Sequence, residues 1–183
     1  MKTKVQLQTF DNQNFNGGAG WLKRILWHFI NGIFFKSFFH FYSLKVLFLR
    51  VFGAKVGRNV VIKPHVNIKY PWNITIGNDV WIGEEVWIDS LDKVFIGNDV
   101  CISQGALLLC GNHNYNKSTF DLMTGQIILE DGVWIGAKSV VCAHVICYSH
   151  SVLGVLSVAT KNLNPYTIYR GNPAEPIKER TIE

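Results

Sequence analysis

The sequence predicts a parallel β-helix, an all-β fold in which the chain winds as a solenoid, and three observations carry this prediction. Aliphatic or small apolar residues recur every six positions, glycine often follows them, and a small or branched residue comes four positions later. Neither a helix nor a strand produces a period of six, whereas short repeats of fixed length are typical of solenoids. The series is Val56, Ile62, Ile68, then Ile76, Ile82, Ile88, then Ile96, Ile102, Leu108, and finally Leu129, Ile135, Val141, Cys147, Leu153, Ala159.

Residues 1–52 precede the repeat and are rich in aromatic residues from position 21 onward. Basic residues interrupt this stretch, at Lys23, Arg24, Lys36, Lys45 and Arg50. No run of about 18 apolar residues exists, so one or two helices fit better than a membrane-spanning helix. Two roles stay open: a cap over the unpaired strand edge of the β-helix, and peripheral membrane attachment through the aromatic face.

Composition narrows the class of protein. A chain of 183 residues favours one domain with accessory ends, and its formal net charge is +5 at pH 7. This charge suits anionic ligands or an anionic membrane surface, but no long basic run indicates nucleic acid as a partner. The four cysteines form no CxxC pair and no signal peptide is visible. We therefore expect reduced thiols and a cytoplasmic location, free or peripheral on the inner membrane surface. Cys147 occupies an apolar slot and is expected in the core.

Residues 53–180 resemble the left-handed β-helix acyltransferases built from hexapeptide repeats. The resemblance rests on the hexads, on a histidine in a loop, and on the C-terminal segment Tyr169-Arg170-Gly171-Asn172-Pro173. It extends to the branch of O-acetyltransferases for colanic acid and related exopolysaccharides, through Leu49-Arg50-Val51-Phe52-Gly53-Ala54-Lys55 after an aromatic N-terminal segment. Maltose and galactoside acetyltransferases are more distantly similar. The resemblance implies a left-handed β-helix of about five coils over residues 53–163, with a C-terminal tail, 164–183, packed on it.

Breaks in the repeat are expected at a single corner, if three hexads form each triangular coil as in that family. The steps from position 68 to 76 and from 88 to 96 are eight residues, and the step from 108 to 129 is twenty-one. The last break is a loop over residues 110–128. Long loops in compact folds are often functional, and this loop holds His113, where the resemblance places the catalytic base.

An alcohol is a poor nucleophile until a base removes its proton, and histidine has a suitable pKa for this task. His113 is therefore expected to be the general base of an acetyl transfer. Its neighbours Asn112 and Asn114 are candidate acceptor-binding residues, although the family commonly has aspartate where this chain has Asn114. Asp89, in a slot that glycine usually holds, is expected either to bind the acceptor or to cap a turn.

No metal is expected. His144 and His150 are six residues apart, so their side chains should lie on neighbouring faces of the prism and point away from each other. The β-helix carbonic anhydrases, which are similar in fold, bind zinc with a different histidine spacing.

The resemblance implies acetyl-CoA as the acyl donor. Trp134 and Ala137 match family positions along the pantetheine arm, where Ala137 would act through its backbone amide and carbonyl. Thr160, Lys161 and Lys178 match positions near the nucleotide end, whose phosphates suit lysine. Simple solvent exposure stays open as the role of both lysines.

The repeat also predicts which residues point outward. We assign Val61, Trp81, Cys101, Trp134 and Val152 to the first face, and Asn67, Trp87, Leu107, Val140 and Val158 to the second. The third face is assigned Asn73, Lys93, His113 and Ile146. Two apolar stripes exceed what a lone soluble prism should expose, and contact between unlike faces can close into a ring. The resemblance makes this a homotrimer with active sites between subunits.

These expectations describe an acetyl-CoA-dependent O-acetyltransferase acting on a sugar hydroxyl of an exopolysaccharide or a lipid-linked saccharide. A free sugar, serine, an antibiotic hydroxyl or an amine stay open as acceptors. The alternative from outside the enzymes is a non-catalytic β-helix scaffold, which thermal stabilisation by coenzyme A would exclude.

Overall fold

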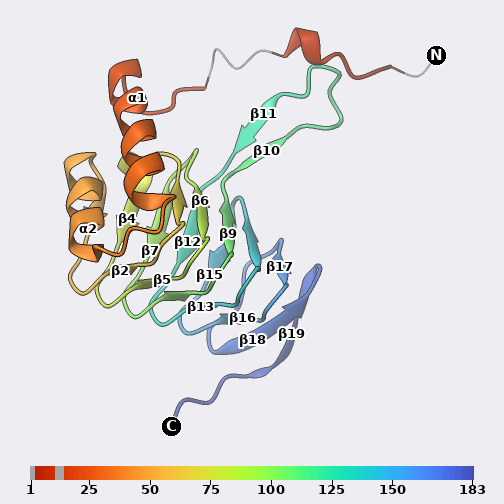
Figure 1. The fold of residues 1–183 in the computed structure, drawn as a ribbon. Coiled ribbons are helices and arrows are strands. Elements are labelled where there is room, and N and C mark those ends of the chain that lie inside the picture. Colours follow the sequence, from red (N-terminus) through yellow and green to blue (C-terminus); the bar gives the residue numbers. More distant parts are fainter. Residues whose placement is uncertain (1–2, 11–14) are drawn as a thin grey trace.

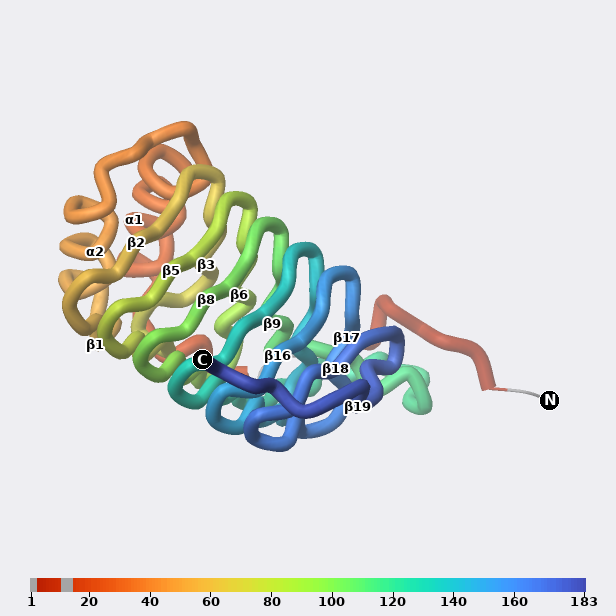
Figure 2. Tube along the Cα trace, turned by 90° about the horizontal axis from the view of Figure 1, so that it is seen from below, coloured from red at the N-terminus to blue at the C-terminus, as the bar shows by residue number. Residues whose placement is uncertain are grey.

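The chain winds into a parallel β-helix whose N-terminal end is covered by two α-helices (Figure 1). The structure is a computed structural model that describes residues 3–10 and 15–183. Successive coils stack side by side along one axis from the helices to the C-terminal hairpin (Figure 2). The predicted fold class is confirmed. The predicted N-terminal segment, 1–52, includes residues 1–2 and 11–14, which lie outside the described residues.

Each coil contributes one strand to each of three sheets, which form the faces of the prism. The β1 sheet contains β1 (Lys55–Val56), β4 (Ile74–Ile76), β7 (Val94–Ile96), β12 (Ile127–Leu129) and β15 (Ile146–Cys147). The β2 sheet contains β2 (Val61–Ile62), β5 (Trp81–Ile82), β8 (Cys101–Ile102), β13 (Trp134–Ile135), β16 (Val152–Leu153), β18 (Thr167–Gly171) and β19 (Ala174–Glu179). The β3 sheet contains β3 (Asn67–Ile68), β6 (Trp87–Asp89), β9 (Leu107–Leu109), β14 (Val140–Cys142) and β17 (Val158–Ala159).

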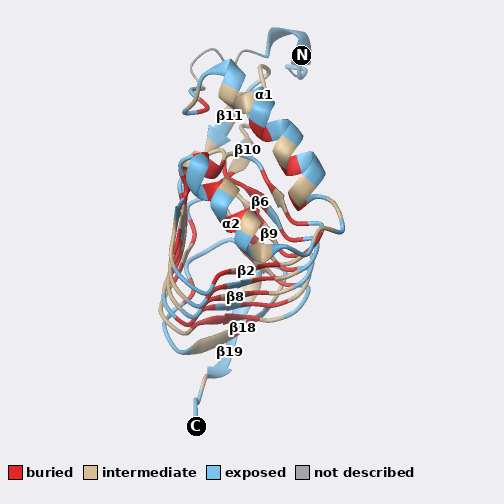
Figure 3. Cartoon of the chain, turned by 60° about the vertical axis from the view of Figure 1, so that its left-hand side comes forward, coloured by how far each residue is buried: buried red, intermediate tan, exposed pale blue. Residues whose placement is uncertain are grey.

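The six-residue repeat sets both the register and the core. Ile62, Ile82 and Ile102 pair in one ladder and are fully buried, and the matching residues of the other two sheets are buried except Val56 in the first coil, which is partly buried. Figure 3 shows these buried positions lining the inside of every coil. The five predicted coils are present, and Leu163 and Tyr169 begin a sixth by pairing with Cys147 and Leu153.

The hexads meet at turns that need a left-handed backbone. The residue before the small or branched position of each hexad has a positive φ, for example 58° at Asp79 and 66° at Gly105. Glycine, asparagine, aspartate and histidine are enriched in this conformation. His65, His144 and His150 occupy such turns, with φ of 59°, 68° and 59°. Their place in the repeat is thus explained by backbone geometry.

Two helical segments cap the first coil. They comprise α1 (Trp21–Ile30), which continues into the π-helical turn η2 (Asn31–Phe35), and α2 (Tyr42–Val51). Carbonyl groups of this coil have no earlier strand to pair with, and one side chain serves each sheet. Arg50 donates to the Val56 and Gly57 carbonyls, Lys45 to those of Ile62 and Lys63, and Trp27 to that of Ile68. The capping role anticipated for this segment is therefore present.

The irregular steps of the repeat all lie at the corner between the β3 and β1 sheets. The first break forms the 3₁₀ turn η3 (Pro71–Asn73), and Asn73 donates to the Ser90 carbonyl in the second break. The third break is an antiparallel hairpin of β10 (Gly111–His113) and β11 (Leu122–Thr124), and not a simple loop. A short 3₁₀ turn, η1 (Leu7–Thr9), lies near the hairpin tip, where Gln6 N–H donates to the Ser118 carbonyl (Figure 1).

Outward assignments were wrong on the third face and at Val152. The eight-residue steps move the outward positions from Asn73 to Thr75 and from Lys93 to Phe95. After the hairpin the next outward residue is Ile128, and it pairs with Ile146, which was assigned correctly. Asn73 is buried, and His113 lies on the hairpin and not on a prism face. Val152 is also buried, because it pairs with Ile168 and Arg180 crosses nearby to the His150 carbonyl. All three faces therefore carry apolar outward residues, and the stripes alone do not select an interface.

Candidate active site

His113 is the last residue of β10, where the hairpin leaves the corner of the third coil. It lines an open cavity of about 440 Å³, here called the His113 cavity. The hairpin, the corner residues of the earlier coils and the N-terminal segment supply its walls. The lining residues are Phe10, Phe15, Lys69, Tyr70, Asp89, Leu91, Leu109, Gly111, Asn112, His113 and Leu122.

The ring of His113 is held in one tautomer. Its Nδ1 lies 2.8 Å from the carbonyl oxygen of Phe120, and a carbonyl only accepts hydrogen bonds, so Nδ1 donates the proton. In the neutral ring, Nε2 then carries the lone pair that a general base uses. The Phe120 ring stacks on His113, with centroids 4.5 Å and planes 8° apart. Phe120 has a φ of 52°, an uncommon value for a bulky residue that indicates a constrained site.

Asp89 lies on the wall of the same cavity and is only 4% exposed. Lys69 Nζ is 3.0 Å from Asp89 Oδ1, forming an ion pair. In the described part of the chain, no donor is aligned on Oδ1 for a hydrogen bond. That oxygen is enclosed by protein, and the Lys69 ammonium supplies its counter-charge, so any contact of Asp89 with a ligand in the cavity would come through the rest of its carboxylate.

The two candidate asparagines have different environments. Asn112 lines the His113 cavity, and its side-chain oxygen accepts the His113 backbone N–H at 2.8 Å. Asn114 is not among the lining residues. Its side-chain oxygen instead accepts the Asn116 N–H at 3.1 Å, within the turn of the hairpin. The structure thus brings Asn112, Asp89 and His113 together and leaves Asn114 beside them.

The five candidate cofactor positions do not line the His113 cavity of their own chain. Trp134 is 47% exposed on the β2 sheet, opposite the corner that bears the hairpin, and donates to Ser103 Oγ. Ala137 follows β13, and its carbonyl accepts the Leu156 N–H. Thr160 and Lys161 follow β17 at the His113 corner, two coils further along, and Lys178 is exposed on β19.

The sequence named only Asp89, Asn112 and His113 among the cavity residues, and the residues it missed include Phe10, Lys69 and Tyr70. Lys69 could have been found, because it precedes Asp89 by the twenty residues of one coil and therefore lies beside it. Phe10 has no repeat signal. Its ring lies 5.8 Å from that of His113 because the N-terminal segment meets the hairpin.

Two cysteine thiols are made unreactive by burial. Burial raises the pKa of the Cys147 thiol to about 12 and that of Cys110 to about 12, so neither is a nucleophile near neutral pH.

Among residues 3–10 and 15–183, no group of three or more histidine, cysteine or acidic side chains could hold a metal ion. Within the same ranges, no helix is both long and apolar enough to cross a membrane.

A triangular β-helix that carries a histidine on a corner hairpin defines the class of hexapeptide-repeat acetyltransferases. Sequence comparison agrees: the chain is 34% identical over 168 residues to the colanic acid biosynthesis acetyltransferase WcaF of Escherichia coli (strain K12), whose assignment is itself provisional. The match covers 92% of each chain. The chain belongs to this acetyltransferase family. No protein-family profile matches it.

Solved structures support the fold. A hexapeptide-repeat acetyltransferase of Vibrio cholerae, complexed with acetyl-CoA, has a TM-score of 0.81 at 20% identity. The similarity covers 96% of this chain and 97% of that one. A galactoside acetyltransferase in complex with coenzyme A has a TM-score of 0.76 at 25% identity, covering 87% and 82% of the two chains.

Proposed function

We propose that this protein transfers an acetyl group from acetyl-CoA to a sugar hydroxyl in exopolysaccharide or lipid-linked saccharide biosynthesis. The observation that carries the proposal is the fixed tautomer of His113, which leaves Nε2 as a base within a cavity of sugar size. Membership of the WcaF family supports the reaction and the acceptor class. The coenzyme A complexes of similar folds support the donor.

In the proposed reaction, His113 Nε2 removes the proton of the acceptor hydroxyl as its oxygen attacks the thioester carbonyl. The new C–O bond forms, the C–S bond breaks, and the proton returns from the imidazolium to the departing thiolate. We assign the Asp89 carboxylate and Asn112, which line the cavity, to the binding of other hydroxyl groups of the sugar. We assign Asn114 to the acceptor side as well, next to the base.

We further propose that the active protein is a homotrimer with its sites between subunits. Trp134 lies on the face opposite the His113 corner, so a single chain does not offer both to one acetyl-CoA molecule. A neighbouring copy would bring its Trp134 and Ala137 to the hairpin. Thr160, Lys161 and Lys178 would then hold the phosphates of the cofactor.

Peripheral contact of residues 21–52 with a membrane also belongs to the proposal. Leu22, Leu26 and Phe29 are 65%, 55% and 61% exposed on the face of α1 opposite the buried Trp27. Exposed apolar residues next to lysine and arginine suit an anionic lipid surface. Co-sedimentation with anionic vesicles tests this, and an unbound protein would remove the membrane from the proposal.

The function is tested by thiol release from acetyl-CoA over a panel of sugars that includes a polyprenyl-linked one. His113→Gln should lower kcat by about 10²–10⁴ and leave the oligomeric state unchanged. Full turnover in that variant would rule out His113 as the base. Serine, chloramphenicol and an amino sugar in the same panel decide between acceptor classes.

A further inference from the structure

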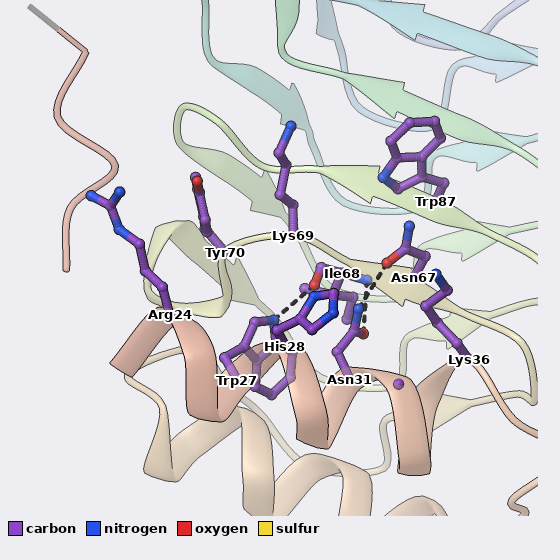
Figure 4. Close-up of a pocket in the computed structure, with 11 residues that line it drawn as sticks. Arg24, Trp27, His28, Asn31, Lys36, Asn67, Ile68, Lys69, Tyr70 and Trp87 are labelled. Atoms are coloured by element: carbon purple, nitrogen blue, oxygen red, sulfur yellow. Dashed lines mark hydrogen bonds between the residues drawn. The ribbon is translucent and has the colours of Figure 1, made fainter. Parts of the chain in front are cut away.

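A second cavity of about 460 Å³ lies between α1 and the third strand of the first coil, here called the α1 cavity. Figure 4 shows the α1 side chains on one wall and Lys69, Tyr70 and Trp87 on the other. The lining residues are Arg24, Trp27, His28, Asn31, Gly32, Lys36, Asn67, Ile68, Lys69, Tyr70 and Trp87.

The lining of the α1 cavity is basic. Arg24, Lys36 and Lys69 supply three cations, His28 supplies ring N–H donors, and no aspartate or glutamate among the described residues lines the cavity. In residues 3–10 and 15–183, no carboxylate lies within 4.0 Å of Arg24, His28 or Lys36. The counter-charge of Lys69 is Asp89, which lines the neighbouring His113 cavity. A concave surface with this charge concentrates anions.

Hydrogen bonds hold part of the cavity wall before any ligand binds. Trp27 Nε1 donates to the Ile68 carbonyl at 2.8 Å, and Asn31 Nδ2 donates to Asn67 Oδ1 at 2.8 Å (Figure 4). Arg24 Nε donates to the Ala19 carbonyl, and its guanidinium lies 5.8 Å from the Tyr70 ring centre. This part of the wall needs no ordering when an anion binds, which favours affinity, whereas the exposed side chains of His28 and Lys36 would become ordered on binding.

The two cavities share a wall. Lys69 and Tyr70 line both the α1 cavity and the His113 cavity, so a ligand in one is adjacent to a ligand in the other. On its opposite face, α1 exposes Leu22, Leu26 and Phe29. The helix α1 therefore lies between a basic cavity on one side and an exposed apolar face on the other, and the basic cavity adjoins the His113 cavity.

We propose that the α1 cavity binds the diphosphate of a diphosphate-linked saccharide and so positions its sugar in the His113 cavity. This inference rests on the proposed function and narrows its acceptor. Nucleotide sugars and lipid-linked saccharides share a sugar diphosphate. The exposed apolar face of α1 favours the lipid, whose chain would extend along it.

Binding is tested first with sodium pyrophosphate by titration calorimetry, which needs no turnover. Lys36→Gln and His28→Gln should each raise Kd about 10- to 100-fold, since each removes a charge-assisted hydrogen bond. Lys55→Gln, which removes an exposed lysine outside the cavity, is the matched control and should bind as the wild type does. Loss of binding in Lys161→Gln together with normal binding in Lys36→Gln would place pyrophosphate in the acetyl-CoA site and overturn the inference.

Kinetics then identify the source of the diphosphate. The same sugar is supplied in three forms: free, as a nucleoside diphosphate ester, and as a short polyprenyl diphosphate ester. Lys36→Gln should raise KM about tenfold for the diphosphate esters, keep kcat, and leave the free sugar unaffected. An equal effect on all three would refute the assignment. If the wild-type protein acetylates the nucleoside diphosphate ester better than the polyprenyl ester, the diphosphate-binding site stands and the lipid-linked acceptor is excluded. If no form is acetylated, the proposed function fails, while the calorimetry still decides the inference.

Discussion

The buried lysine that caps the first coil makes stability depend on pH in an unusual direction. Lys45 is fully buried, and its Nζ donates to the carbonyls of Ile62 and Lys63 at 3.3 Å and 2.8 Å. Burial lowers its pKa from 10.5 to about 8. Between these values the unfolded chain binds a proton that the folded chain does not, so the free energy of unfolding rises with pH.

The size of the effect follows from the pKa difference. Each pKa unit corresponds to about 1.4 kcal/mol, so the difference between the folded and unfolded pKa of Lys45 adds about 3 kcal/mol to the free energy of unfolding between pH about 8 and pH 10.5. Below pH 8 both states are protonated and the contribution is flat. Lys45→Met removes the titration and leaves two carbonyls without a donor, which costs about 1–3 kcal/mol for each. The stability gap between wild type and variant should therefore widen by about 3 kcal/mol as the pH rises.

Urea denaturation at equal protein concentration, from pH 7.5 to pH 10.5, measures this gap. Lys55→Met, which removes an exposed lysine of the same coil, should run parallel to the wild type. Parallel curves for wild type and Lys45→Met would refute the argument, because the buried amine would then not titrate in this range.

Three further outcomes are expected. Trp27→Phe keeps a buried aromatic ring but removes the 2.8 Å hydrogen bond to the Ile68 carbonyl. It should lower the free energy of unfolding, measured by urea denaturation, by about 1–3 kcal/mol. An unchanged urea midpoint would show that this hydrogen bond does not stabilise the first coil. Asp89→Asn leaves Lys69 without its counter-charge and should raise the KM for the acceptor about tenfold, with a smaller change in kcat. Lower stability with an unchanged KM would make Asp89 a structural residue. Trp81→Glu, on the β2 sheet, should give monomers by light scattering while Phe95→Glu, on the β1 sheet, stays trimeric, and the reverse would move the interface to another face.

The period of six predicts what depends on the repeat. It places Ile62, Ile82 and Ile102 in one ladder because each coil must return its apolar residue to the same inner surface. The same counting finds the corner at which the chain departs from the prism. The counting fails for the third face, because the two extra residues in the step from 68 to 76 move the outward position from Asn73 to Thr75.

Features that depend on contacts outside the repeat could not be derived. The hairpin pairing of Asn112 with Met123 has no periodic signal, and Phe10 approaches His113 only because the N-terminal segment meets the hairpin tip. The donors that close the first coil are equally hidden, because a lysine among aromatic residues gives no sign that it is buried. Candidate chemistry at His113 came from resemblance, and its tautomer came from the structure.

The stacking of coils also fixes the axial distance between α1 and the hairpin. The helix α1 meets the first coil and the hairpin leaves the third, so two coil spacings separate them along the axis. At about 4.8 Å per strand spacing, this offset is roughly 10 Å. Inserting or deleting one twenty-residue coil between them would change the offset by one step and leave both ends of the prism intact. Coil number therefore sets the distance between α1 and the hairpin in steps of one strand spacing.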